Sequence, residues 1–222
     1  MSCDGFKKEG ITFPSSEMQA KLLTEIYQES NITFSNVSYF EAHGTGTKAG
    51  DPEEVKAIDR ALANKCERQL LLGSLKSNMG HAEAASGICS IIKVLISMET
   101  GFIPPNIHLK RIKKGLEGIE QNRIKIVTET TKLLDHEAVV SLNNFGFGGN
   151  ICHILLQRFK KDKIEGGLPK DDVPRLVCVS GRTNEAVLKM LNDVSTKNLD
   201  EEYISLLHQL YKVNFPNHRY RG

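Results

Sequence analysis

The stretch EAHGTGT, residues 41–47, decides how the rest of this 222-residue chain is interpreted. It overlaps the end of an aromatic and β-branched run at residues 37–42, which predicts a short strand. His43 therefore stands at the carboxyl end of a strand and opens a loop too rich in glycine for a core element. In α/β proteins reactive groups gather at such strand ends. For His43 alone, a core histidine bonded to backbone explains the pattern equally well.

The next segment repeats this layout. Residues 70–72 form an apolar run typical of a buried strand, and the polar segment GSLKSNMGH follows at residues 73–81. We expect Lys76 and His81 in one loop that folds both side chains toward one cavity. A lysine is usually a surface charge, but a position directly after a buried strand weakens that alternative.

A third segment, NNFGFGGN at residues 143–150, lies between two strands that we expect at residues 138–142 and 151–156. A glycine-rich hairpin is therefore predicted. Glycines let a backbone approach a ligand closely and leave N–H groups free to face an anion. A plain tight turn is the alternative.

Helix signals frame these loops. Ser15 and Ser16 are possible N-caps, and Asp51 is expected to cap a helix with Pro52 in its first turn. A long helix is expected at residues 82–98 and is ended by Gly101. The other expected elements are strands at residues 123–127 and 176–179 and helices at residues 183–194 and 201–211.

Together the three loop segments resemble the signature loops of the β-ketoacyl synthases, the condensing enzymes of fatty acid and polyketide synthesis. The matching motifs are HGTGT at residues 43–47, KSNMGH at residues 76–81 and NFGFGG at residues 144–149. Their order and spacing agree with that family. One departure is Ile151, which stands where the family usually has an asparagine, two residues after the Gly-Gly pair.

Segments outside these loops resemble the animal fatty acid synthase branch: DGF at residues 4–6, EGITFP at 9–14, VSGRT at 179–183 and RYRG at 219–222. The resemblance implies the C-terminal half of a thiolase-like layered α-β-α-β-α fold, followed by a small α/β linker domain. The expected domains are the C-terminal part of a ketosynthase at residues 1–158, a linker at 159–174 and part of the ketosynthase–acyltransferase linker domain at 175–222.

The resemblance also implies an activity, the decarboxylative Claisen condensation of an enzyme-bound acyl thioester with malonyl on an acyl carrier domain. His43 and His81 would donate N–H bonds to the enolate oxygen, as an oxyanion hole does. Lys76 would orient the second histidine. Phe147 would be the gating aromatic, and Thr45 and Thr47 would contact the pantetheine arm. The expected substrate-binding residues are Phe147, Gly146, Gly148, Thr45 and Thr47.

The family's cysteine nucleophile has no counterpart among the five cysteines, Cys3, Cys66, Cys89, Cys152 and Cys178. None has the small, serine-rich surroundings of that nucleophile, so we expect this chain alone to be inactive, a fragment of a fatty acid synthase. The odd number and scattered positions favour reduced thiols over disulfides or a zinc site. No metal or cofactor is expected, because the acyl carrier domain carries the phosphopantetheine.

The composition of the chain argues against some classes of binding partner. A net charge of +2 gives no strong field for nucleic acid or an anionic membrane, and a basic cluster at residues 110–114 is typical of a solvated loop. No apolar run reaches the ~18 residues of a membrane span. The resemblance implies an acyl carrier domain, the rest of the synthase chain and a second copy in a homodimer as partners, in the cytoplasm.

Three alternatives stay open. GTGTKA at residues 44–49 matches a dinucleotide-binding fingerprint, although Asp51 would repel the pyrophosphate and the strand at residues 70–72 offers no acid for a ribose. A catalytically dead remnant acting through protein contacts is the second alternative. The third is the ketosynthase of an iterative polyketide synthase, because the sequence fixes neither the product class nor the chain length.

Overall fold

The computed structural model describes residues 1–4, 10, 13–133, 138–158, 174, 176–196 and 201–222. The chain forms two compact units, residues 1–160 and 161–222, and each is described by itself. The linker expected at residues 159–174 lies outside the described residues, except for Pro174.

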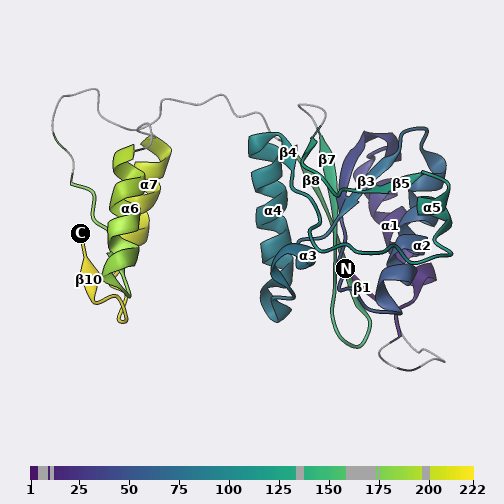
Figure 1. Cartoon of the computed structure of the whole chain (residues 1–222), viewed down its shortest axis with the longest axis horizontal. Coiled ribbons are helices and arrows are strands. Elements are labelled where there is room, and N and C mark those ends of the chain that lie inside the picture. The colour runs from purple at the N-terminus through teal and green to yellow at the C-terminus, as the bar shows by residue number, and fades with distance from the viewer. Residues whose placement is uncertain (5–9, 11–12, 134–137, 159–173, 175, 197–200) are drawn as a thin grey trace. The chain divides into compact units, whose positions relative to one another are not determined.

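A six-stranded sheet forms the centre of the first unit, in the order β1-β8-β7-β2-β3-β5 (Figure 1). Its four parallel strands are β7 (Val139–Phe145), β2 (Val37–Glu41), β3 (Leu70–Gly73) and β5 (Ile124–Ile126). The expected hairpin is confirmed, because β8 (Asn150–Gln157) returns antiparallel to β7. The short strand β1 (Ser2–Cys3) pairs with the outer side of β8.

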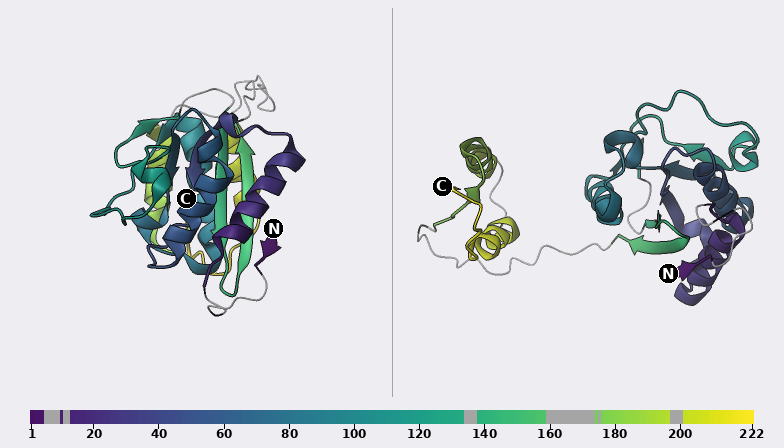
Figure 2. Two further views of the ribbon diagram at one scale, coloured as in Figure 1. Left: turned by 90° about the vertical axis from the view of Figure 1, so that its right-hand side faces the viewer. Right: turned by 90° about the horizontal axis from the view of Figure 1, so that it is seen from below.

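Helices cover both faces of this sheet (Figure 2). α1 (Ser16–Ser30) and α2 (Gly50–Ala61) share one hydrophobic core with the sheet, and α4 (Ser86–Thr100) shares a second core on the opposite face. Phe40 belongs to the first core and its neighbour Tyr39 to the second, since successive side chains of a strand point to opposite faces. A layered α/β arrangement follows, as predicted.

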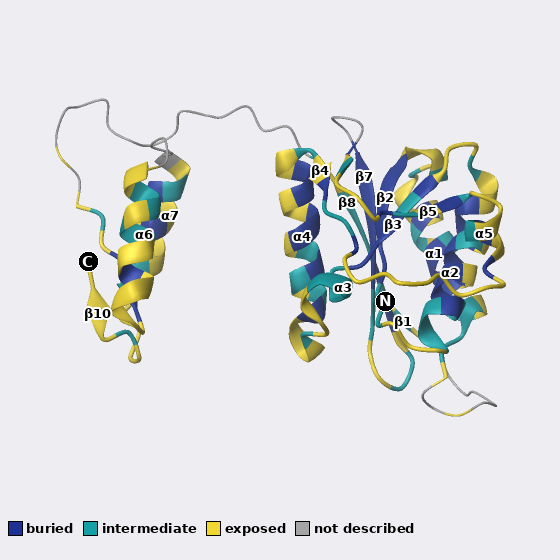
Figure 3. Cartoon of the chain, viewed as in Figure 1, coloured by how far each residue is buried: buried dark blue, intermediate teal, exposed yellow. Residues whose placement is uncertain are grey.

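The outer side of α4 is apolar as well. Four of its aliphatic side chains at helical spacing are between 49% and 61% exposed: Ile88, Ile92, Leu95 and Ile96. Figure 3 shows this exposed side facing away from the sheet, while the side that faces the sheet is buried. A helix on the surface of a complete domain is normally polar on its outer side, so this apolar face is typical of an interface.

Helix ends follow the sequence signals with two exceptions, the start of α4 and the cap of α2, where Ala49 and not Asp51 stands at the N-cap position. Ser15 caps α1, because its side chain accepts the N–H of Met18 at 3.3 Å. Gly101 ends α4 in the left-handed region, with φ 75°. The helix expected from residue 82 begins at Ser86 instead, after a 3-10 turn at Glu83–Ala85.

Smaller elements complete the first unit. They are the helices α3 (Lys76–Met79) and α5 (Glu117–Glu120), 3-10 turns at Phe34–Asn36 and Ala63–Lys65, and a pair of short strands, β4 (Phe102–Ile103) and β6 (Thr131–Lys132). None of the described helices has the length and apolar character of a bilayer span.

The second unit contains α6 (Asn184–Thr196), α7 (Glu201–Tyr211) and a strand pair, β9 (Ser180–Gly181) with β10 (Tyr220–Arg221). The strand expected at residues 176–179 is wrong. Only Val179 meets a partner there, through two bonds with Gly222 of 2.9 and 3.0 Å. Apolar character alone does not make a strand when no neighbouring strand runs beside it.

Candidate active site

The three predicted loops leave the sheet side by side. β7, β2 and β3 are adjacent and parallel, so their carboxyl ends lie at one edge of the sheet. His43 follows β2, the segment with Lys76 and His81 follows β3, and Phe145 ends β7. The topology therefore brings together three motifs that are far apart in the sequence.

The two histidine rings meet at this edge. The ring centroids of His43 and His81 are 5.5 Å apart and the ring planes are inclined at 82°. The ring of Phe145 also packs against His43, with centroids 5.1 Å apart. Two imidazoles at this separation can direct N–H groups at the same small group of a ligand.

The backbone sets the tautomer of His43. The N–H of Phe145 donates to His43 Nδ1 at 3.2 Å, and a backbone N–H can only donate. Nδ1 therefore carries the lone pair and Nε2 the proton. Asn144 Oδ1 lies 3.1 Å from this Nδ1 and accepts the hydroxyl of Ser86 at 3.0 Å. An amide oxygen cannot donate to the lone pair of Nδ1, so it is hydrogen-bonded to the ring only when Nδ1 is protonated, and that bond raises the pKa of His43. Burial, and then the charge of Lys76, lower the pKa of His43 to about 4, so the ring is neutral at neutral pH.

A single hydrogen bond gives His81 the same tautomer as His43. Its Nδ1 accepts the N–H of Glu83 at 2.8 Å, which places the proton of a neutral ring on Nε2. Glu83 has φ 47°, and the ring is otherwise exposed. No hydrogen bond between described residues uses the Nε2 of either histidine, so both Nε2–H groups are available to a ligand.

Lys76 is the first residue of α3 and not part of an open loop. Its Nζ is buried, and no described group is hydrogen-bonded to it. Lys76 therefore makes no hydrogen bond to His81 that would serve its expected role of orienting that histidine. Burial lowers the pKa of Lys76, and the opposite charges of Glu54 and Glu41 act against that shift.

A buried ion pair that the sequence analysis missed lies between the two histidine loops. Nζ of Lys93 lies 2.7 Å from Oε2 of Glu41, and their side chains are 5% and 0% exposed. The hydroxyl of Tyr39 donates to the same Oε2 at 2.6 Å, and Oε1 accepts the N–H of Leu75 at 2.6 Å. The pair thus ties the end of β2 to the segment that leads to His81. The signal was a lysine inside the apolar run of α4.

The glycine-rich turn forms, but Phe147 does not close over the histidines. Its side chain is 83% exposed at the tip of the turn, between Gly146 and Gly148. The N–H of Gly146 donates to the carbonyl of Asn150 at 2.9 Å. Gly148 has φ 87°, a conformation that side chains with a Cβ rarely adopt.

Phe145, and not Phe147, is the aromatic residue that contacts His43. Ile151 pairs with Phe145 across the hairpin and is 3% exposed. The departure from the family pattern at this position therefore places a buried apolar side chain opposite Phe145 in the hairpin.

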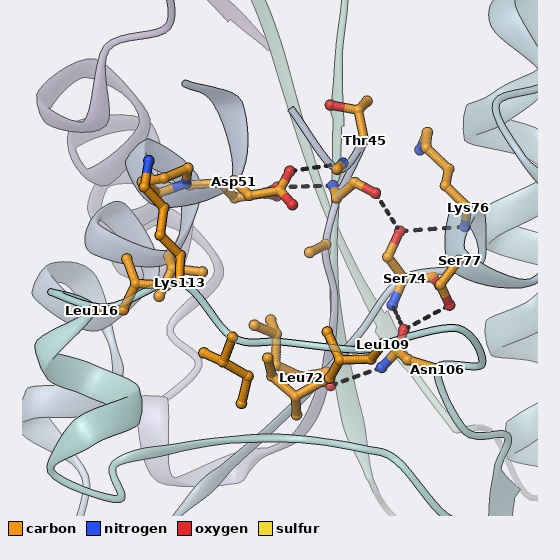
Figure 4. A pocket seen from close by; sticks show the side chains of 18 of the residues that line it. Thr45, Asp51, Leu72, Ser74, Lys76, Ser77, Asn106, Leu109, Lys113 and Leu116 are labelled. Carbon is orange, nitrogen blue, oxygen red and sulfur yellow. Dashed lines mark hydrogen bonds between the residues drawn. The ribbon is translucent and has the colours of Figure 1, made fainter. Parts of the chain in front are cut away.

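A cavity of about 1250 Å³ opens beside the loop that follows His43 (Figure 4). Thr45, Thr47 and Lys76 are among its lining residues, whereas the two histidines are not. Its other lining residues include apolar side chains of the core and the residue that precedes α5: Val55, Leu72, Ile126 and Leu116.

Asp51 lies on the opposite side of this cavity from Lys76 (Figure 4). It is not the N-cap of α2, which begins at Gly50; its carboxylate accepts the N–H of Gly46 at 3.0 Å. A phosphate at this loop would need the N–H group that Asp51 already holds. The dinucleotide alternative is therefore disfavoured by the loop itself.

The basic segment at residues 110–114 is exposed along the cavity. Lys113 Nζ donates to the carbonyl of Lys48 at 2.8 Å. Within the described part of the chain, no group of His, Cys, Asp or Glu side chains could hold a metal ion. The five cysteines are free thiols.

Protein-family models match nearly the whole chain in two segments. Residues 1–110 match the model described as "Beta-ketoacyl synthase, C-terminal domain", and residues 113–222 match "Ketoacyl-synthetase C-terminal extension". The boundary between the two models falls inside the first compact unit.

Curated relatives are synthases much longer than this chain. The highly reducing polyketide synthase srdA of Neurospora crassa is 43% identical over 159 residues, which are 68% of this chain and 7% of that protein. The compactin diketide synthase mlcB of Penicillium citrinum is 42% identical over 169 residues, 75% of this chain and 6% of that protein. The chain thus spans a small part of the length of these relatives.

Solved ketosynthases share the fold. The ketosynthase from module 6 of the bacillaene synthase from Bacillus subtilis 168 matches with a TM-score of 0.73 and 27% identity, over 93% of this chain and 36% of that chain. The module 1 ketosynthase of the Bacillus amyloliquefaciens synthase matches with a TM-score of 0.73 and 27% identity, over 90% and 35%. The predicted thiolase-like fold is confirmed.

Proposed function

The chain belongs to the β-ketoacyl synthases, whose C-terminal domain and C-terminal extension it matches, and from this premise we propose that it forms the histidine half of the condensing site of an iterative polyketide synthase. The segments at residues 4–6 and 179–183 had favoured an animal fatty acid synthase. A highly reducing polyketide synthase and a diketide synthase among the relatives support the alternative. Both classes perform the same condensation, so the change concerns the product and not the chemistry of the site.

The pair of imidazoles carries the proposal. His43 and His81 lie 5.5 Å apart at neighbouring strand ends, and each Nδ1 accepts a backbone N–H. When a malonyl thioester loses CO2, the electron pair of the broken C–C bond forms an enolate with its charge on the thioester oxygen. Two Nε2–H donors on that oxygen stabilise it, each by roughly 2.7–4 kcal/mol.

The low pKa of His43 suits this role. With a pKa of about 4, the ring at neutral pH donates a hydrogen bond but is too weak an acid to protonate the enolate. The enolate carbon can then attack the carbonyl carbon of the acyl thioester. The new C–C bond forms as the cysteine thiolate leaves, and that cysteine comes from outside this chain.

The remaining roles follow from the resemblance and stay part of the proposal. Thr45 and Thr47, at the cavity, would contact the pantetheine arm of an acyl carrier domain. Phe147, exposed at the tip of its turn, would gate the acyl group, with the N–H groups around Gly146 and Gly148 near the thioester oxygen. Lys76 supplies charge near His43. The synthase would work as a cytoplasmic homodimer.

The exposed apolar side of α4 supports assembly with more of a ketosynthase. The chain spans about a third of the solved ketosynthases, 35% and 36% of the two chains compared. We propose that the matching remainder of such a domain covers Ile88, Ile92 and Ile96 and brings the nucleophile to the histidines.

A chimeric synthase tests this function. In a highly reducing polyketide synthase related to srdA, residues 1–160 replace the matching segment, and release of CO2 and carbon–carbon bond formation are measured. We expect an active chimera, in which His43→Ala and His81→Ala each lower kcat by about 10²–10³. Lys56→Met, on the exposed side of α2, serves as the control. Histidine variants as active as the parent chimera would contradict the proposal.

A further inference from the structure

Glu54 has no part in the proposed chemistry, yet its carboxylate lies against the backbone of His43. It projects from α2 and is 2% exposed. Oε1 accepts the N–H of His43 at 2.8 Å, and Oε2 accepts the N–H of Gly44 at 2.9 Å. Oε1 also accepts Nδ2 of Asn143 at 3.0 Å. One buried carboxylate therefore receives three donors.

The two backbone donors have left the sheet. β2 ends at Glu41, so the N–H groups of His43 and Gly44 have no neighbouring strand to pair with. Gly44 has φ 47°, which turns the chain away from the strand. Because buried N–H groups need a partner, a side chain from a helix takes the place of a strand at this point.

The third donor connects the carboxylate to the ring of His43. Asn143 lies on β7 directly before Asn144 and Phe145, the two residues in contact with His43 Nδ1. The other end of the Asn143 amide, Oδ1, lies 2.8 Å from Nδ1 of His153. The Glu54 carboxylate is thus bound directly to the backbone of His43. It is linked to the ring of His43 indirectly, through Asn143 and its two neighbours on β7.

The charges around Glu54 come from four elements. Asp51 lies on the same helix, His43 at the end of β2, Lys76 on α3, and His153 on β8 behind Asn143. Burial raises the pKa of Glu54 to about 7; the N–H groups of Gly44 and His43 and the Asn143 amide lower it, and Asp51 raises it. A protonated carboxyl presents one O–H donor, which conflicts with an N–H donor, so only the carboxylate accepts all three groups.

We propose that Glu54 is the positioning residue of His43. By accepting the N–H groups of His43 and Gly44, its carboxylate holds the imidazole with Nε2 toward the reacting oxygen, and protonation of Glu54 loosens this hold. The catalytic meaning of this role rests on the proposed function, but the contacts that define it do not.

Nuclear magnetic resonance of the 222-residue chain with 13C- and 15N-labelled histidine tests the role. In the wild-type chain the His43 ring signals should shift near pH 7, as Glu54 titrates, and again near pH 4. Glu54→Gln should remove the step near pH 7. Glu53→Gln should keep both steps, because Glu53 contacts Lys56 and Ser16 and not His43.

A second variant tests the hold itself. In Glu54→Ala the loop loses its acceptor and water reaches the ring, so the pKa of His43 should rise from about 4 toward 6.5. The ring proton should then be shared between Nδ1 and Nε2. His43→Gln assigns the signals. An unchanged step near pH 7 in Glu54→Gln, or an unchanged pKa and tautomer in Glu54→Ala, would overturn the proposal.

The wild-type titration and Glu54→Gln keep the test decisive if Glu54→Ala does not fold. Neither readout needs turnover. If the chimera is inactive but the His43 signals of the wild-type chain shift near pH 7 as expected, the result counts against the proposed function alone. If the chimera is active but the wild-type chain lacks the step near pH 7, the result counts against the role of Glu54 alone.

Discussion

The loops of His43 and His81 reach the same place by different means. The His43 loop is held by groups of three other elements, through the buried side chains of Glu54 on α2 and Ser74 after β3 and the N–H of Phe145 on β7. The ring of His81 is exposed and is held by the N–H of Glu83, two residues further along its own loop. Long-range contacts preorganise one donor, and a local turn sets the other.

This difference separates what each loop contributes. Preorganisation is useful for an oxyanion site, because donors that are already in place need no rearrangement when the charge develops. His43 meets this condition within the described chain. The ring of His81 is exposed, so another part of a ketosynthase domain can pack against it and complete the site.

The largest effect should come from cutting the tie between the two loops. In Lys93→Met the carboxylate of Glu41 stays buried without its cation, and we expect a loss of about 3–5 kcal/mol in the free energy of unfolding. Urea denaturation measures it. The control is Lys56→Met, which breaks an exposed pair with Glu53 of 3.0 Å and should cost less than ~1 kcal/mol. Equal losses would show that the buried pair does not join the loops.

Two glycines sharpen the comparison by backbone strain. Gly44 and Gly80 have φ of 47° and 81°, one in each histidine loop. An added Cβ at Gly44 would lie 2.6 Å from Cβ of Ser74, whereas at Gly80 it would meet nothing within 4 Å. We expect Gly80→Ala to cost about 1–3 kcal/mol and Gly44→Ala clearly more. Thermal unfolding of both variants measures the two losses of stability. A larger loss for Gly80→Ala than for Gly44→Ala would mean that the His81 loop, and not the His43 loop, is the more rigid one.

The smallest effect, taken per pH unit, concerns the pH dependence of stability. Burial lowers the pKa of His43 to about 4 and that of His153 to about 3, from 6.5. Between these values and 6.5 the unfolded chain binds more protons, so their contribution rises with pH and is lost on acidification, by up to about 1.4 kcal/mol per pH unit and group. Glu54 acts oppositely, because its raised pKa makes its contribution fall between pH 4.5 and about 7.

Unfolding free energies measured from pH 4 to 7 check this balance. His43→Gln and His153→Gln should each reduce the rise of stability with pH, and the double variant should reduce it most. A double variant with the wild-type slope would mean that neither ring is buried in its neutral form.

Much of the site was predictable because its parts are local. Apolar runs at residues 37–42 and 70–72 gave the strands, and the polar, glycine-rich segments after them gave the loops. Parallel neighbouring strands then force those loops to one edge of the sheet. The sequence could not show that Glu54 accepts the N–H groups of the His43 loop or that Lys93 pairs with Glu41. Each contact depends on how a helix packs against a strand distant in sequence.

Two aromatic residues show the same limit. Phe145 and Phe147 lie in one glycine-rich motif, and only the folded hairpin reveals that Phe145 contacts His43 while Phe147 is exposed. The product class was equally out of reach. The motifs encode a condensation that fatty acid and polyketide synthases share, so they carry no chemistry that separates the two.

The most direct test is a crystal structure of the chimeric synthase with a malonyl thioester analogue that cannot lose CO2. The account predicts Nε2 of His43 and Nε2 of His81 both about 2.7–3.1 Å from the same thioester oxygen. An oxygen that reaches only one of the rings, or a ring that presents Nδ1 to it, would contradict the account.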